Sequence, residues 1–200
     1  KYGIVVQHGT QSRSDPIWAD QVSDVRSGKY GKMKVSHGFC CKPRNGIGFE
    51  PYSNPPDNLD WNLWKGPAII DRYHKNLAHY NWHWFWHWGN GELGNNGVHS
   101  LDVCRWGLDV DYPTKVTSAG GRYAFEDDQQ TPDTNSVIFE FEDRRSITWQ
   151  GLSCNRNGDG FVDFFGENGS MVIGGGGEYT LYDRNNKQVE TEAGSRGDQE

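Results

Sequence analysis

The 200-residue chain carries 27 acidic residues and 20 lysines and arginines, and its formal net charge of −7 argues against a nucleic-acid partner. No stretch approaches the roughly 18 consecutive apolar residues of a membrane-spanning helix, and no signal-peptide pattern is visible at the start. Phe, Trp and Tyr make up 14% of the chain, so we expect aromatic rings to fill much of the core and to line any binding cleft.

The first predicted elements are a strand and a helix. Apolar residues dominate positions 2–7, which indicates a short buried strand. Asp15 followed by Pro16 is the pair expected at the start of a helix, and Gly28 is the residue expected just beyond its end. A helix is therefore predicted over residues 15–27.

A sheet is predicted from Gly31 onward. Residues 32–41 alternate loosely between apolar and polar side chains, which indicates the first strand of a large sheet. Residues 51–67 are rich in Pro, Asn and Asp and indicate a loop. Trp61 and Trp64 are expected to anchor that loop by packing rather than to contact a ligand.

Most of the second half of the chain is predicted to form strands. A hairpin turn is expected at residues 142–145 and a loop at the glycine run 174–177, and the acidic tail after Gln188 is expected to be loose. Such a meander makes an open, mainly antiparallel sheet with helices on one face. The predicted strands cover residues 115–124, 135–142, 146–152, 161–165, 170–173 and 178–182.

The most unusual stretch runs from residue 80 to residue 106. It holds four Trp and two His within seven residues, then a glycine-rich turn, and then a segment with the pattern of an amphipathic helix. Val98, Leu101 and Trp106 fall near helical spacing, so we expect them to share one face of that helix.

His99 and Asp102 lie three residues apart and would be neighbours on the helix surface. An imidazole at the mouth of a glycine-rich turn, held by a carboxylate, suits a general base. The alternative is a histidine at a helix N-terminus that is hydrogen-bonded to a carbonyl group.

His83 and His87 have the spacing of zinc ligands on a helix. However, no Glu stands beside His83, and the flanking Trp and Asn residues favour a strand or an irregular segment, so no metal site is predicted. Trp82, Trp84 and Trp86 are candidates for lining a sugar-binding cleft, in which rings stack on the C–H faces of the ligand. The alternative is packing in the core, which we expect for at least two of the three.

Asp127 and Asp128 are adjacent acids, and a pair of carboxylates can cleave a glycosidic bond. They lie in a predicted turn without an apolar pocket around them. The sequence therefore predicts a solvated acidic loop.

The segment GNGELGNNGVHSLDVCRWGL, residues 89–108, resembles the signature of the C-terminal domain of Gfo/Idh/MocA oxidoreductases. In that family a glycine-rich turn opens a helix whose His accepts or donates the proton of a sugar or cyclitol hydroxyl. The resemblance gives this role to His99, with Asn95 and Asp102 positioning it. Asn95 stands where the family has Asp, and it can hydrogen-bond a hydroxyl but cannot share a proton with His99.

Two other segments resemble the same family. Residues 5–32 are similar to its passage out of the nucleotide-binding domain, which places Gln11 and Arg13 beside the cofactor. An Arg at a strand end can face phosphate or carboxamide groups, although a solvated surface Arg is equally compatible with the pattern. Lys42 and Arg44 match positions where a subgroup of the family places basic residues toward the active cleft, and a polar strand end is the alternative.

The resemblance implies an α+β fold in two parts. Residues 1–28 would be the end of a Rossmann domain with its crossover helix. Residues 29–200 would form a large, mostly antiparallel open sheet backed by helices, incomplete at the C-terminus, that binds substrate and pairs with a second subunit through its open face.

The implied activity is hydride transfer between NAD or NADP and a carbon that bears a sugar or cyclitol hydroxyl. The family's Glu-Lys-Pro element, and a G-x-G-x-x-G after an opening strand, are missing from this sequence. We therefore expect a chain cut at both ends that does not bind the cofactor alone. The alternatives are a non-catalytic carbohydrate-binding or dimerisation module, and a metal hydrolase in which His83, His87 and His99 converge.

Overall fold

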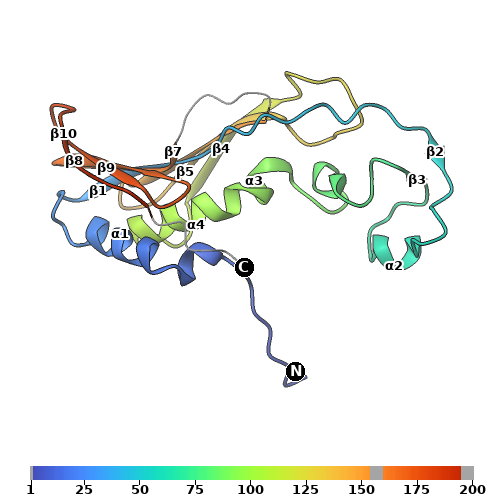
Figure 1. Cartoon of the computed structure of the whole chain (residues 1–200), viewed down its shortest axis with the longest axis horizontal. Coiled ribbons are helices and arrows are strands. Elements are labelled where there is room, and N and C mark those ends of the chain that lie inside the picture. Colours follow the sequence, from blue (N-terminus) through green and yellow to red (C-terminus); the bar gives the residue numbers. More distant parts are fainter. Residues whose placement is uncertain (1, 154–159, 195–200) are drawn as a thin grey trace.

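A computed structural model describes residues 2–153 and 160–194 and shows an eight-stranded sheet with helices on one face (Figure 1). The strand order is β10-β9-β8-β7-β1-β6-β5-β4, and only the β1–β6 pair is parallel. The predicted α+β fold with a mainly antiparallel open sheet is confirmed. The strands are β1 (Met33–Cys40), β4 (Lys115–Gly121), β5 (Thr134–Glu140), β6 (Ser146–Leu152), β7 (Gly160–Gly166), β8 (Gly169–Gly174), β9 (Tyr179–Asp183) and β10 (Gln188–Glu192).

Helix α1 (Pro16–Arg26) follows the one-turn 3-10 helix η1 (Gln11–Ser14) and begins and ends as the sequence predicts. The side chain of Asp15 caps it by accepting a hydrogen bond from the backbone N–H of Ile17 at 3.0 Å. Gly28, just past its end, has a φ of +81°. Trp18, Val22 and Val25 of α1 are buried in one core with the sheet and α4.

Helix α4 (Gly97–Leu108) packs across β1, β6 and β7 with small residues against the sheet. A Cβ added to Gly38 of β1 would lie 2.9 Å from Oγ of Ser100, and one added to Gly107 would run into the ring of Phe164. The predicted apolar face is only partly confirmed: Leu101 and Trp106 are half-buried and pack against the core, whereas Val98 is exposed. The close approach of helix to sheet is made by a stripe of smaller buried residues, Gly97, Ser100, Val103, Cys104 and Gly107, and the larger Leu108 is buried where the helix ends.

Two predictions near the ends of the chain were wrong. Residues 2–7 form no strand, because no described strand lies beside them. Val5 and Val6 are 98% and 82% exposed, and in Figure 1 the segment runs away from the body. The predicted loose tail begins instead with an edge strand, since residues 188–192 pair with β9 and Glu190 accepts a hydrogen bond from the Tyr179 hydroxyl at 2.7 Å; residues 195–200 of that tail lie outside the described residues.

Residues 41–90 form a lobe beyond one end of the sheet, with its own aromatic core (Figure 1). Trp61 is buried and stacks on Trp64 with ring centroids 5.4 Å apart, and Trp88 donates from Nε1 to the carbonyl of Lys65 at 3.0 Å. The predicted anchoring role of Trp61 and Trp64 is confirmed. The lobe's elements are β2 (Tyr52–Ser53), α2 (Trp61–Lys65), β3 (Tyr73–His74) and the 3-10 helix η2 (Asn81–Trp84).

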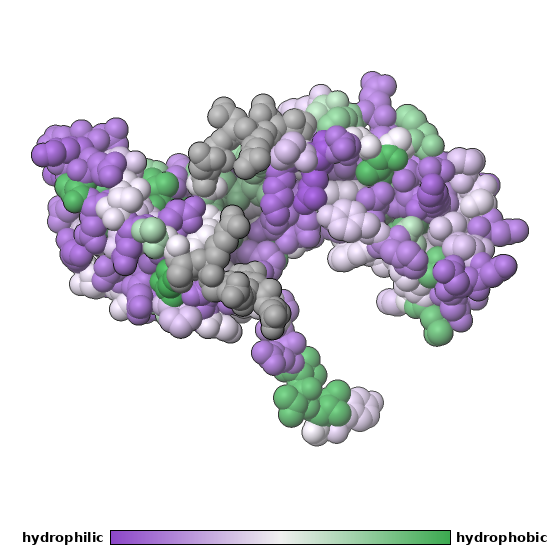
Figure 2. All heavy atoms as spheres, in the orientation of Figure 1, coloured by the Kyte–Doolittle hydropathy of each residue, from purple (hydrophilic) through white to green (hydrophobic). Residues whose placement is uncertain are grey.

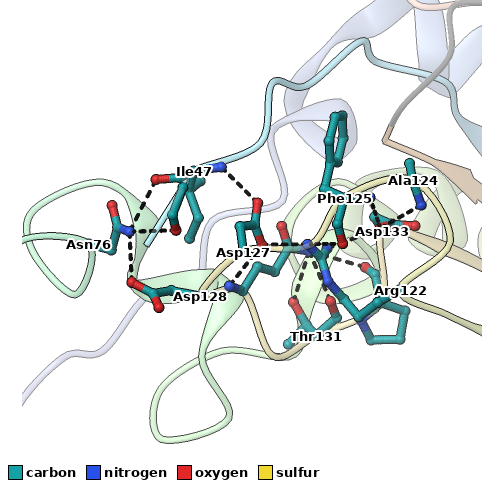
Figure 3. Close-up of polar contacts among 12 residues, drawn as sticks. Ile47, Asn76, Arg122, Ala124, Phe125, Asp127, Asp128, Thr131 and Asp133 are labelled. Atoms are coloured by element: carbon teal, nitrogen blue, oxygen red, sulfur yellow. Dashed lines mark hydrogen bonds and ion pairs between the residues drawn. The ribbon is translucent and has the colours of Figure 1, made fainter. Parts of the chain in front are cut away.

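A buried acidic network joins the lobe to the loop after β4 (Figure 3). Arg122 pairs with Asp127 and lies 3.2 Å from Asp133, and these two carboxylates are only 2% and 1% exposed. Asp127 also accepts from the backbone N–H of Ile47 at 2.8 Å, and Asp128 accepts from Asn76 at 3.0 Å. The prediction of a solvated acidic loop was therefore wrong, because Ile47 and Asn76, from distant parts of the chain, join the nearby Arg122 in binding these acids.

Candidate active site

The candidate site lies where the turn between α3 (Gly91–Asn95) and α4 meets the segment that follows β1. Gly91 opens α3 with a φ of +70°, and a Cβ there would lie 2.9 Å from Cβ of Thr131, so the turn requires glycine. One residue, Asn96, separates the two helices. Lys42 and Arg44 both reach this turn from the end of β1.

Glu92 is the buried centre of the site. Its side chain is 2% exposed, and its carboxylate accepts hydrogen bonds from Arg44 at 3.3–3.4 Å and from the Cys40 thiol at 3.3 Å. It also accepts from the side-chain amides of Asn95, at 3.5 Å, and of Asn96. The sequence analysis missed Glu92. The available signal was a single acid within a stretch of Gly and aromatic residues, where a carboxylate has few places to be solvated.

Arg44 connects this centre to the lobe. Its guanidinium donates to the Tyr80 hydroxyl at 3.2 Å and lies 5.6 Å from the ring centroid of Trp84. Burial works against the charged form, but Glu92 and Tyr80 more than offset it, so the pKa of Arg44 is raised. Burial, followed by the Glu92 charge, raises the pKa of the Cys40 thiol to about 12, so this thiol stays a proton donor at neutral pH.

Lys42 is exposed and donates from Nζ to Oδ1 of Asn96 at 2.9 Å. Asn96 also contributes its backbone carbonyl, which accepts from the N–H of His99 at 3.1 Å in the first turn of α4. The structure thus brings Lys42, Arg44, Asn95 and His99 of the predicted site around one turn.

His99 is half-buried, and its Nδ1 is buried without a hydrogen-bond partner in the described part of the chain. Asp102, expected to position this ring, instead accepts two hydrogen bonds from Arg13, at 2.7 and 2.9 Å. Arg13 also lies 4.5 Å from the ring centroid of Trp106. Gln11 is exposed on η1, which packs against α4.

The aromatic stretch is neither a strand nor a uniform cleft wall. Trp84 is 3% exposed in the lobe core, whereas Trp82 and Trp86 are 43% and 59% exposed. The expectation that at least two of these three rings pack in the core was therefore wrong. This stretch bridges the sheet and the lobe above a concavity in the molecular outline (Figures 1 and 2).

His83 is buried between the rings of Tyr80, Trp82 and Trp84, and this burial lowers its pKa. His87 is exposed. Within residues 2–153 and 160–194, no group of three or more His, Cys, Asp or Glu side chains is arranged to bind a metal ion. Over the same residues no helix has the length and apolar character of a membrane span.

Comparison with known proteins gives a family match and many structural matches. The family model described as the GFO/IDH/MocA C-terminal domain matches residues 68–172. Levoglucosan dehydrogenase in complex with NADH and levoglucosan is similar to this chain at a TM-score of 0.62 and 17% identity, over 94% of this chain and 47% of that one. No curated protein matches the sequence.

Two further solved structures share the fold. An oxidoreductase domain protein from Kribbella flavida has a TM-score of 0.59 at 13% identity, over 90% of this chain and 45% of that one. An NAD-binding oxidoreductase from Klebsiella pneumoniae has a TM-score of 0.58 at 15% identity, over 92% of this chain and 44% of that one. The chain thus spans about half the length of these oxidoreductases.

Proposed function

Since the chain belongs to the Gfo/Idh/MocA C-terminal domain family, we propose that it forms the substrate-binding part of a nicotinamide-dependent oxidoreductase acting on a sugar or cyclitol hydroxyl. The observation that carries this proposal is the arrangement around Asn96. Lys42 bonds the Asn96 side chain, the neighbouring Asn95 amide bonds Glu92, and His99 joins the turn through its backbone N–H, which donates to the Asn96 carbonyl; the buried Glu92–Arg44 pair supports this arrangement.

Within this site each side chain has a distinct task. His99 accepts the hydroxyl proton as the substrate is oxidised and returns it in the reverse reaction. Asn95 and Lys42 hydrogen-bond neighbouring hydroxyl groups and fix the orientation of the ring. Trp82 and Trp86, both exposed, offer flat apolar surfaces to the C–H face of a sugar, while the buried Trp84 supports them from the lobe core.

The nicotinamide, NAD or NADP, supplies the hydride acceptor when it is bound. Of the two side chains that the resemblance places beside the cofactor, Arg13 is already paired with Asp102, and Gln11 is exposed. Residues 89–94 have the spacing G-x-G-x-x-G, but a turn rather than a strand precedes them and residues 91–94 already lie in the five-residue α3, unlike a dinucleotide fingerprint. The described residues therefore fit only the edge of a dinucleotide site, and we assign no catalytic step to the cofactor.

The same family membership supports a proposal for the chain's organisation. Residues 1–28 would end a nucleotide-binding domain, with α1 as the crossover helix, and residues 29–200 would bind substrate. The face of the sheet away from α4 would pair with a second copy, because Ile138 and Phe165 remain 44% and 36% exposed there. Sedimentation of the wild type and of Ile138→Lys tests this pairing: we expect a dimer and a monomer, and a monomeric wild type would contradict it.

Titration of the chain with glucose, levoglucosan and myo-inositol, followed by Trp fluorescence, tests the proposed substrate site. At least one of these polyols should give a saturable change, because Trp82 and Trp86 are exposed in the segment that leads into the α3–α4 turn. Lys42→Met and Asn95→Leu should weaken that binding at least tenfold, while the exposed Lys187→Met in the β9–β10 turn should not. Failure of all three polyols to change the fluorescence would overturn the proposal.

A further inference from the structure

Glu92 has no role in the proposed reaction, yet it is the most deeply buried charge near the site. A buried carboxylate is stable only when its charge is compensated and its oxygens are hydrogen-bonded. Arg44 supplies the charge, and the Cys40 thiol and the amides of Asn95 and Asn96 supply further donors. This number of donors exceeds what is needed to neutralise one charge.

The carboxylate fixes which way each amide faces. An ionised carboxylate can only accept hydrogen bonds, so the NH2 group of each neighbouring Asn must face it. The carbonyl oxygen of Asn96 then points away from Glu92, and that oxygen is the one that accepts from Lys42 at 2.9 Å. Asn95 is oriented in the same way, with its NH2 group 3.5 Å from Oε1 of Glu92 and its carbonyl oxygen directed elsewhere.

We propose that Glu92 is a positioning residue that sets the donor and acceptor pattern of the substrate site. Through Asn96 it places the ammonium group of Lys42, and through Asn95 it presents a carbonyl oxygen as an acceptor for a substrate hydroxyl. This inference rests on the proposed function for its consequence in substrate binding. Its geometric part, the orientation of the two amides, does not depend on any substrate.

The isosteric variant Glu92→Gln tests the geometric part. A Gln side chain carries its own NH2 group, so Asn96 can turn its carbonyl toward residue 92 and its NH2 group toward Lys42, where two donors would then meet. By nuclear magnetic resonance of the chain, we expect the side-chain NH2 protons of Asn96 to exchange with water at least tenfold faster in this variant. The exposed Glu142→Gln in the β5–β6 turn is the matched control and should not change them.

Backbone amide exchange in α4 separates positioning from loss of structure. The proposal expects the protection of Val103 and Cys104, which are fully buried, to stay the same in Glu92→Gln. Should the variant lose this protection, Asn96→Leu gives an independent test, because it removes the connection to Lys42 and keeps the Glu92–Arg44 pair. It should then reproduce the binding defect of Lys42→Met.

Polyol binding tests the consequence. Glu92→Gln should raise the dissociation constant at least tenfold, Glu92→Asp should restore part of the affinity, and adding Lys42→Met to Glu92→Gln should cause little further loss. Unchanged exchange of the Asn96 amide in folded Glu92→Gln, unchanged binding by Asn96→Leu, or fully additive effects would overturn the inference. A wild type that binds no polyol would instead count against the proposed function, because the exchange experiment needs no ligand.

Discussion

Replacing Arg122 with Met should destabilise the chain by removing the only cation that the described structure places between Asp127 and Asp133 (Figure 3). Both carboxylates are almost completely buried, so neither can recover its hydration when the guanidinium is lost. Breaking a buried ion pair from one side typically costs about 3–5 kcal/mol. We expect Arg122→Met to lower the free energy of unfolding by about 3 kcal/mol. The loss should not be larger, because both acids keep backbone donors, such as Ile47 for Asp127 and Tyr123 for Asp133.

The loss should depend on pH with a defined sign. Although burial opposes ionisation of Asp133, the N–H groups of Tyr123, Ala124 and Phe125 and the Thr134 hydroxyl keep its pKa below the ordinary value. Its stabilising contribution is therefore present above an unfolded pKa of about 3.9 and is lost as the pH falls through the folded pKa. The difference between wild type and variant should be largest above pH ~5 and should shrink toward pH ~3, as the pH approaches the lowered folded pKa of Asp133 and protonation begins to remove its charge.

Urea denaturation followed by Trp fluorescence measures this difference at both pH values. Arg184→Met, which removes an exposed Arg from the β9–β10 turn, is the matched control and should change stability by less than about 0.5 kcal/mol. Arg122→Lys should lie between the wild type and Arg122→Met, because it keeps the charge but loses the planar fork. A loss below about 1 kcal/mol at pH 7, or an equal loss at low pH, would refute the reasoning.

Three further substitutions test other parts of the structure by denaturation. Gly107→Ala should lower the free energy of unfolding by about 1–3 kcal/mol, because the added Cβ would meet the Phe164 ring. The higher helix propensity of Ala offsets part of this loss. A more stable variant would contradict the close helix–sheet contact. Burial raises the pKa of Asp163 to about 6. The stability of the wild type should therefore fall relative to that of Asp163→Asn as the pH rises from about 4 to about 6. A stability difference between the two proteins that does not change with pH would exclude this burial effect. Asp15→Ala should cost about 1 kcal/mol through loss of the bond from Ile17, and an unchanged midpoint would show that this cap is unimportant.

Local signals in the sequence were sufficient for the elements whose partners are close in the chain. The start of α1 depends on Asp15 and Pro16, and the β5–β6 hairpin depends on one short turn, so both could be predicted. Residues 2–7 have an equally strong strand pattern, but a strand needs a neighbour that the pattern itself does not specify.

The turn that holds the candidate site was predictable in its position, but its connections were not. The resemblance at residues 89–108 located the turn, and the structure places Lys42 and Arg44 against it. The pairing of Asp102 with Arg13, 89 positions away in the chain, and the convergence of donors on Glu92 depend on tertiary packing. Spacing along a helix predicts neighbours on that helix and does not exclude a stronger partner from elsewhere.

The central claim is that this chain binds a sugar or cyclitol at the α3–α4 turn. Its most direct test is to map, by nuclear magnetic resonance, which backbone and side-chain amides shift when levoglucosan, glucose or myo-inositol is added to the chain. The shifts should cluster at Lys42, Asn95, Asn96 and His99 and extend to the indole groups of Trp82 and Trp86. Shifts that cluster elsewhere, or no shifts at saturating polyol, would contradict it.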